Sequence, residues 1–334
     1  MKKITICGGG NLGHVCAGYL ASQSDIEVSL LTTKPNEWSH RIEVIDPKGK
    51  VYNGVLAKIS DKAQEVIPEA EIVLLCLPGF AIREVLLSIA PYLALETWVG
   101  SVVSSTGFFF ECFNILSKSQ PLFGFQRVPF ISRIIRYGYK VELKGYKESL
   151  SVAVEQIVGK ESIRSTLEML FHTPVKLLDN HYEVSLSNSN PLLHTSRLYS
   201  MWKDWEPGMV YHHKPGFYSE WTLDASELYI AMDVEFQILL KSLGVREGGI
   251  PSVLEYYESD DAVSLTKKIR SISAFQGIES PMKHTGNGWI PDFESRYFRE
   301  DFPYGLKFIY NLLQELHISS TYIDRVYKWG MSNC

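Results

Sequence analysis

The chain lacks a long hydrophobic run, a cluster of basic residues and any cysteine pair with the spacing of a metal site. No apolar stretch approaches the ~18–20 residues needed to cross a bilayer, so we predict no membrane span. The net charge of −5, with no run of Lys or Arg, argues against nucleic acid or an anionic membrane as the main partner. The net negative charge is still compatible with a small anionic ligand, because such a ligand needs only a few positive groups at its binding site.

The cysteines exclude several classes of site. None belongs to a CxxC pair or to a Cys/His set with zinc spacing, so we predict no bound metal. Free cysteines behave as small hydrophobes, and such usage is typical of a reducing compartment. The first residues resemble a signal peptide, but residues 8–11 and His14 interrupt the apolar region, so we expect a cytoplasmic protein. The five cysteines are Cys7, Cys16, Cys76, Cys112 and Cys334.

The first half of the chain alternates short apolar runs with helical patterns. Strands are predicted at 3–7, 27–32, 71–77 and 97–103, and helices at 12–22 and 81–93. The strand candidates are apolar along their whole length, which is typical of a parallel sheet covered on both faces. This β-α-β alternation predicts an α/β fold of the doubly wound, Rossmann type.

The pattern changes in the second half. Residues 128–154 alternate and carry turn glycines, which predicts antiparallel strands that extend the sheet. Beyond about residue 183 the chain reads as helical, with one helix at 224–243 that begins with an Asp224/Glu227 capping box and another at 303–317. Because 334 residues exceed what one core usually organises, we predict two domains, an α/β domain at 1–182 and an all-α domain at 183–334.

The stretch "ITICGGGNLG" contains the spacing Gly8-x-Gly10-x-x-Gly13 between a predicted strand and a predicted helix. Gly8 permits a tight turn, Gly10 leaves room for a pyrophosphate, and Gly13 lets the helix pack close to the strand. Backbone N–H groups at the helix start, including Asn11 and Leu12, would then face the phosphates. The context predicts a dinucleotide site, the alternative being a purely structural turn.

The end of the second strand, "LLTTKP", distinguishes NADP from NAD. NAD sites usually carry an Asp or Glu there to bind the ribose 2′-OH, whereas this chain has Thr32, Thr33 and Lys34, with Arg41 further on. Hydroxyls and cations suit a 2′-phosphate, so we expect NADP, with NAD as the alternative. The two cations could equally be solvated surface charges. Pro78, after the strand at 71–77, is a further candidate for cofactor contact at the same sheet edge.

A single histidine stands out in the second half. Asn190 is a favoured N-cap and the following proline a favoured first helical residue, so "NPLLHT" predicts a helix with His194 in its first turn. The positive end of a helix favours the neutral ring, which can accept a proton. A structural histidine is the alternative.

The stretch "SRYFREDFPYGL" supplies charged partners ahead of the last long helix. Arg296 could bind a substrate carboxylate in a bidentate fork, and Asp301 could orient His194. The alternative is a plain helix start near residues 301–303 with solvated arginines. Trp289 could line an amino-acid pocket or simply pack in the core.

Four stretches resemble the octopine/nopaline (opine) dehydrogenase family over nearly the whole chain. They are "GGGNLG" near the start, "CLPGF" after the strand at 71–77, "NSNPLLHT" at the start of the second domain and "RYFREDFPYGL" near the end. The helical domain of this family is similar to 6-phosphogluconate dehydrogenase-like proteins. One departure is Thr195, since the family commonly has proline after the histidine.

The resemblance implies a reaction in which the amine of an amino acid condenses with a 2-oxo acid such as pyruvate. Hydride from a nicotinamide cofactor then reduces the imine. It implies that His194 is the catalytic acid/base and Asp301 its paired carboxylate. It also implies that Arg296 holds a substrate carboxylate and that Asn190 helps to shape the site.

Two other functions stay open. One is an NADP-dependent reductase of a 2-oxo or 3-hydroxy acid that uses no amine substrate. The other is a binding protein that senses NADP(H) without catalysis, although a sensor would need neither His194 nor Asp301. A homodimer through the aromatic-rich second domain is a further hypothesis.

Overall fold

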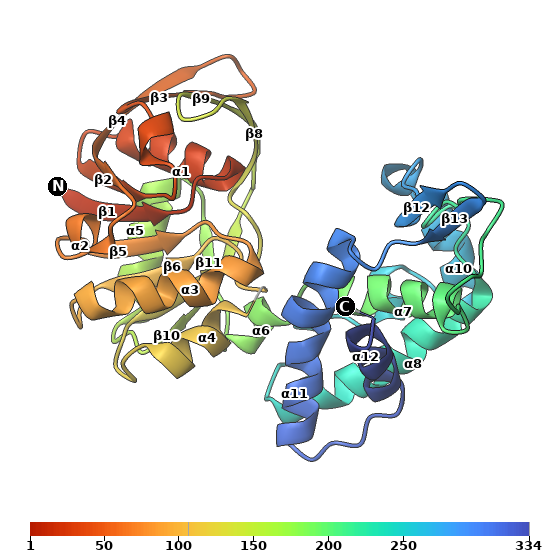
Figure 1. Ribbon diagram of the computed structural model, residues 1–334. Helices are drawn as coiled ribbons and strands as arrows, with labels where there is room; N and C mark the ends of the chain where they lie inside the picture. Colours follow the sequence, from red (N-terminus) through yellow and green to blue (C-terminus); the bar gives the residue numbers. More distant parts are fainter. Residues whose placement is uncertain (106, 334) are drawn as a thin grey trace. The chain divides into compact units, whose positions relative to one another are not determined.

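The computed structural model describes residues 1–105 and 107–333, and it divides into two compact units, Met1–Ser187 and Asn188–Cys334 (Figure 1). Cys334, named above, lies outside the described residues. Cys7, Cys16, Cys76 and Cys112 are free and buried. Across the described chain, no helix combines the length and the apolar character that a membrane span requires.

The first unit contains one sheet of 11 strands in the order β11-β10-β7-β6-β5-β1-β2-β4-β3-β9-β8. Its centre, from β7 to β4, is parallel throughout, which confirms the predicted α/β fold. All four predicted strands are present, with ends that differ by at most two residues. The central strands are β1 (Lys2–Cys7), β2 (Ile26–Leu31), β4 (Val51–Ser60), β5 (Ile72–Leu75), β6 (Trp98–Ser101) and β7 (Leu122–Phe125).

The prediction of antiparallel strands within 128–154 is confirmed at both edges of this sheet. β8 (Phe130–Arg136) and β9 (Lys140–Tyr146) form an antiparallel pair at one edge, and β10 (Leu150–Glu155) pairs antiparallel with β7 towards the other. β3 (Arg41–Ile45), which pairs antiparallel with β4, was not predicted. β11 (Val175–Leu177) completes the sheet beside β10.

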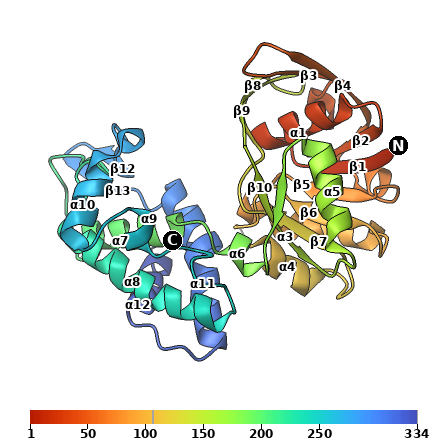
Figure 2. The same cartoon turned by 180° about the vertical axis from the view of Figure 1, so that it is seen from behind.

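Helices cover both faces of the sheet (Figures 1 and 2). α1 (Asn11–Ala21) and α5 (Lys160–Phe171) bury their apolar residues against one face. α2 (Ala63–Val66), α3 (Gly79–Ile89), α4 (Phe108–Ile115) and α6 (Tyr182–Ser185) line the other face. A hydrophobic core thus lies on each face of the sheet, which explains why the central strands are apolar on both sides. Short 3-10 helices lie at Pro35–Glu37 and Ala90–Tyr92.

The second unit is helical, which confirms the expected helical domain, and it also contains one small hairpin. Two long helices, α7 (Asn190–Trp202) and α8 (Leu223–Ser242), pack together. The hairpin consists of β12 (Met282–Thr285) and β13 (Gly288–Pro291). The remaining helices are α9 (Val253–Tyr256), α10 (Ala262–Ser271), a short 3-10 helix (Ser273–Phe275), a π-helix (Tyr297–Leu306), α11 (Lys307–Glu315) and α12 (Tyr322–Met331).

Three predicted helix starts are wrong in detail. Ser189, not Asn190, is the N-cap of α7. The backbone of Thr222 is extended and its hydroxyl accepts a hydrogen bond from the Ala225 N–H, so Thr222 and not an Asp224/Glu227 box caps α8. The helical stretch predicted to start at residue 303 begins at Tyr297 and contains Pro303. A proline cannot donate the hydrogen bond of a regular α-helix, which is compatible with the π-helical form seen here.

Candidate active site

The glycine turn between β1 and α1 has the geometry of a phosphate-binding turn. Gly8 adopts φ +120°, and a Cβ there would lie 2.5 Å from the Cys76 carbonyl oxygen. A Cβ on Gly13 would collide with the Gly8 carbonyl oxygen, whereas one on Gly10 would meet nothing within 4 Å. Gly10 has no side chain to cap α1, so the N–H groups of its first turn are available to phosphate oxygens. The residues present therefore fit a dinucleotide.

Asn11 and His14 join this turn to the β8–β9 hairpin. The Asn11 side-chain oxygen accepts from the Ile134 N–H at 2.8 Å, which ties this side chain to the hairpin. The His14 Nδ1 lies 3.0 Å from the Gly10 carbonyl oxygen, and its Nε2 accepts from the Gly138 N–H at 2.7 Å. Sequence reasoning missed His14, which is fully buried and holds the hairpin against the glycine turn.

Burial lowers the pKa of His14, which makes the first unit sensitive to acid. The unfolded chain binds a proton at about pH 6.5 and below, where the folded histidine stays neutral, so stability falls as the pH drops through that value. We expect the stability advantage of the wild type over His14→Gln to shrink by at most about 1.4 kcal/mol per pH unit below that point. Urea unfolding of both proteins at about pH 7.5 and 5.5 measures this, and an unchanged difference would contradict it.

The predicted cofactor residues after β2 separate into two groups. Thr32 is buried beside the glycine turn, since a Cβ on Gly9 would lie 2.9 Å from its hydroxyl. Lys34 is exposed, with its Nζ 3.2 Å from Glu37 and 5.6 Å from the centre of the Tyr137 ring. Thr33, between them, is exposed.

Arg41 lies apart from that group and Pro78 lies beside the turn. Arg41 begins β3 opposite Val55, whereas Ser60 is the residue of β4 that pairs with Leu31 at the end of β2. Because Val55 precedes Ser60 by five residues along β4, the backbone of Arg41 lies several residues away from the edge of the sheet at which β2 ends. Pro78 is the N-cap of α3, just after β5, which pairs with β1 at the strand ends where ligands bind such sheets.

In the second unit, His194 and Asp301 meet although 107 residues separate them in the sequence. The Nδ1 of His194 lies 2.8 Å from Asp301 Oδ2. His194 is only 5% exposed and is the fifth residue of α7, just beyond the predicted first turn. Asn190 begins the same helix, and its N–H donates to the Asn188 side chain. A carboxylate bonded to Nδ1 fixes the ring tautomer and would stabilise an imidazolium.

Tyr218, which sequence reasoning missed, occupies the other side of the imidazole. Its hydroxyl lies 2.8 Å from His194 Nε2, and burial raises the pKa of Tyr218 well above its ordinary value. The residue belongs to the irregular segment between α7 and α8. No periodic pattern marks such a residue, so only its position in the folded unit reveals it.

The predicted substrate residues lie at different places in the second unit. The Arg296 side chain is 74% exposed, and its Nε is 3.8 Å from Glu300, too long for a hydrogen bond. Its positive charge opposes the rise that burial causes in the pKa of Tyr218 and Tyr297, the two tyrosines whose rings lie beside His194. Trp289 lies in β13, where its ring contacts His284 and Lys214.

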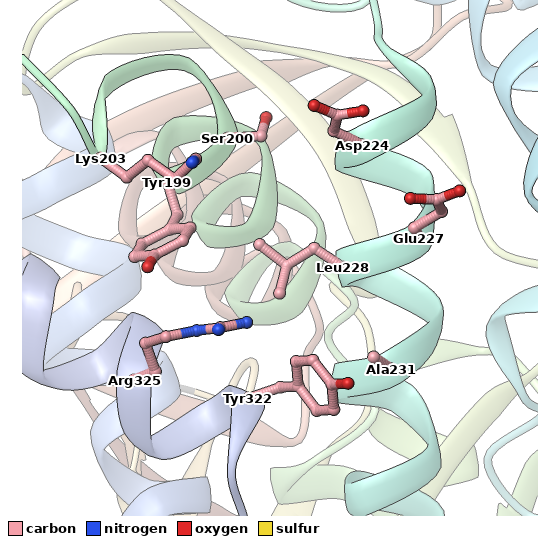
Figure 3. A pocket seen from close by; sticks show the side chains of 9 residues that line it. All are labelled: Tyr199, Ser200, Lys203, Asp224, Glu227, Leu228, Ala231, Tyr322 and Arg325. Atoms are coloured by element: carbon pink, nitrogen blue, oxygen red, sulfur yellow. The ribbon is translucent and has the colours of Figure 1, made fainter.

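A separate groove of about 340 Å³ lies on the second unit (Figure 3). Arg325 reaches into it near Tyr199 and Tyr322, while Asp224 and Glu227 face it from α8. Neither His194 nor Asp301 lines this groove, and its charged side chains are exposed. It is therefore distinct from the candidate active site. Among the described residues, no group of three His, Cys, Asp or Glu side chains could hold a metal ion.

A Rossmann-type unit with a glycine turn and a helical unit with a buried His–Asp pair define a two-domain nicotinamide-dependent dehydrogenase. Residues 177–334 match the family model described as "NAD/NADP octopine/nopaline dehydrogenase, alpha-helical domain". The helical unit of the chain thus matches the opine dehydrogenase family, which supports the resemblance seen in the sequence.

Known proteins resemble the chain along almost its whole length. It is 27% identical to the opine dehydrogenase of Haliotis discus hannai, over 98% of this chain and 89% of the relative. It is 29% identical to the octopine dehydrogenase of Pecten maximus, over 91% of this chain and 83% of the relative. A solved octopine dehydrogenase structure with NADH and L-arginine superposes with a TM-score of 0.86 at 25% identity, covering 99% of this chain and 89% of that one.

Proposed function

We propose that the protein joins an amino acid to a 2-oxo acid by reductive condensation, with His194 as the acid/base. The enzyme is an NAD(P)H-dependent dehydrogenase acting on a CH–NH bond, as its opine and octopine dehydrogenase relatives are named. The observation that carries the proposal is the buried hydrogen bond of 2.8 Å between His194 and Asp301. A protein that only sensed the cofactor would have no use for this pair.

Each group in the proposed mechanism has a physical task. The first-turn N–H groups of α1 hold the pyrophosphate of the cofactor, which supplies hydride to the imine carbon when bound. Neutral His194 receives a proton from the substrate ammonium, so the freed amine can attack the carbonyl. The carboxylate of Asp301 stabilises the imidazolium, which returns the proton as the carbinolamine loses water. The exposed guanidinium of Arg296 holds a substrate carboxylate.

The test is oxidation of NADPH and of NADH, followed by nicotinamide absorbance, with pyruvate and a panel of L-amino acids. Oxidation that requires both substrates supports the proposal. Oxidation with the oxo acid alone would instead indicate a reductase without an amine substrate. Tight cofactor binding without turnover on any pair would favour a sensor.

We also propose that NADP is preferred to NAD. Thr32, Thr33 and Lys34 follow β2 with no carboxylate among them, and a hydroxyl and an ammonium suit a 2′-phosphate. The pairing of Lys34 with Glu37 is exposed, so its loss costs little stability. The octopine dehydrogenase structure named above contains NADH, which makes this preference a point to test directly.

Lys34→Ala is expected to weaken NADPH binding roughly tenfold and to leave NADH binding within about twofold, since each tenfold is about 1.4 kcal/mol. Lys144→Ala is the matched control, because Lys144 is also an exposed, ion-paired lysine of this unit. Fluorescence titration with both cofactors measures the effect. Equal weakening for NADPH and NADH would show that Lys34 does not read the 2′-phosphate.

We further propose that Asn190 and Trp289 contact the substrate, that the protein forms a homodimer and that it is cytoplasmic. The domain limits at 1–182 and 183–334 are proposed as the functional division into a cofactor domain and a substrate domain.

A further inference from the structure

Both ring nitrogens of His194 are already engaged. An ionised carboxylate can only accept, so the Nδ1–H donates to Asp301. The Nε2 of a neutral ring is then an acceptor, and the Tyr218 hydroxyl donates to it at 2.8 Å. The three side chains form a directed chain from Tyr218 through His194 to Asp301. A substrate amine therefore cannot reach the imidazole unless Tyr218 moves or takes part.

The surroundings hold Tyr218 in place. Its ring stacks on Phe275, with 4.1 Å between centroids and 19° between planes, and lies parallel to Trp221. The residue is 5% exposed. The buried Arg197 fixes the loop on both sides of it, since its Nε donates to the Phe217 carbonyl at 3.0 Å and another of its nitrogens donates to the Glu220 carbonyl at 2.8 Å. Displacing the phenol would break this packing, so participation is the simpler route.

We propose that Tyr218 is a further catalytic residue, whose hydroxyl contacts the substrate nitrogen and relays its proton to His194. This inference rests on the proposed function, since it gives the route of the same proton. The substrate ammonium gives a proton to the Tyr218 oxygen as the Tyr218 O–H proton passes to His194 Nε2. The amine becomes neutral, the phenol keeps one proton, and the charge arrives on His194 beside Asp301. The reverse transfer protonates the carbinolamine hydroxyl, which leaves as water.

The two transfers belong to one step. Because burial raises the pKa of Tyr218, a free phenolate is unfavourable there. The oxygen must accept one proton as it releases the other. Asp301 favours this direction, because its negative charge stabilises the imidazolium that results.

Tyr218→Phe tests the relay, since it removes only the hydroxyl and keeps the stacked ring. We expect kcat to fall by roughly 10²-fold or more, with the KM of both substrates and the cofactor affinity within a few fold. Tyr257→Phe is the matched control, because Tyr257 is another buried tyrosine of the unit but bonds to Tyr229. Its kcat should stay near the wild-type value.

Two results would overturn the relay. If Tyr218 merely blocks His194, the phenylalanine variant will keep or raise kcat, because the amine then reaches Nε2 directly. If the Tyr218 phenol is only structural, Tyr218→Phe will change kcat and KM by about the same factors as Tyr257→Phe does.

A readout that needs no turnover separates this inference from the proposed function. The ¹⁵N resonance of His194 Nε2 should shift on Tyr218→Phe and stay unchanged on Tyr257→Phe. If this resonance does not shift on Tyr218→Phe, the hydrogen bond between Tyr218 and His194 is absent in solution. This conclusion does not depend on which substrates the enzyme uses. If the resonance shifts but the wild type turns over no substrate pair, the proposed function fails while the hydrogen-bonded chain stands.

Discussion

His194→Asn is expected to lower kcat by roughly 10²- to 10⁴-fold, with cofactor affinity unchanged. The imidazole bridges Asp301 and Tyr218 with hydrogen bonds of 2.8 Å each, and asparagine cannot carry a proton between them. Asparagine does offer an amide N–H to Asp301, so the carboxylate is not left buried without a donor. Steady-state kinetics with the substrate pair, beside cofactor titration, measures both quantities.

The companion variant Asp301→Asn shows whether the pair acts as a unit. It keeps the shape of the side chain but removes the charge that stabilises the imidazolium, so kcat should again fall strongly. The double variant should be about as slow as His194→Asn alone, because groups that act together are not additive. If the two losses multiplied instead, the residues would act independently and the pairing would have no catalytic meaning. A His194→Asn enzyme with near-normal kcat would refute the acid/base assignment.

The parts of the fold that could be predicted are those set by local patterns. β1, β2, β5 and β6 are short apolar runs, and burial on both faces leaves that record in the sequence. The glycine turn is also local, because the backbone path of Gly8 and the close packing of Gly13 depend on residues nearby in the chain and on one neighbouring strand.

What could not be predicted depends on contacts between distant segments. β3 is only five residues long and alternates apolar with charged residues, which is too short a pattern to identify a strand. Its place in the sheet depends on β4 and β9, which pair with it on either side. The N-cap of α8 is decided by the extended backbone of Thr222, which a search for acidic capping boxes overlooks. The π-helix at Tyr297–Leu306 has no signature that would separate it from a normal helix start.

The candidate site follows the same division. Charge and helix position make His194 and Asp301 candidates, but only the family resemblance favours pairing them, since they are 107 positions apart and no spacing rule joins them. Tyr218 lies in an irregular segment, 24 residues beyond His194. Its role depends on the stacking of Phe275 and on hydrogen bonds from Arg197, neither of which a linear reading contains. The proton route is thus a property of the folded unit rather than of a motif.

Two substitutions in the glycine turn are expected to have different effects, one on cofactor binding and the other on stability. Gly10→Ala should fold normally, because its Cβ meets nothing within 4 Å and its φ of −82° suits any residue. The added methyl occupies space that a pyrophosphate needs, so we expect the Kd for the cofactor to rise roughly 10- to 100-fold, or about 1.4–2.8 kcal/mol. Fluorescence titration with NADPH measures this Kd.

Gly13→Ala should lose stability before it loses binding. Its Cβ would collide with the Gly8 carbonyl oxygen, a backbone atom that cannot rotate away, so we expect a loss of roughly 1–3 kcal/mol in the free energy of unfolding. Urea unfolding of both variants separates the two causes. A Gly10→Ala protein that is stable and binds cofactor normally would show that the pyrophosphate does not lie over this turn. If Gly13→Ala were as stable as the wild type, α1 would have moved away from β1, and the close packing of the turn would not be what holds the cofactor site together.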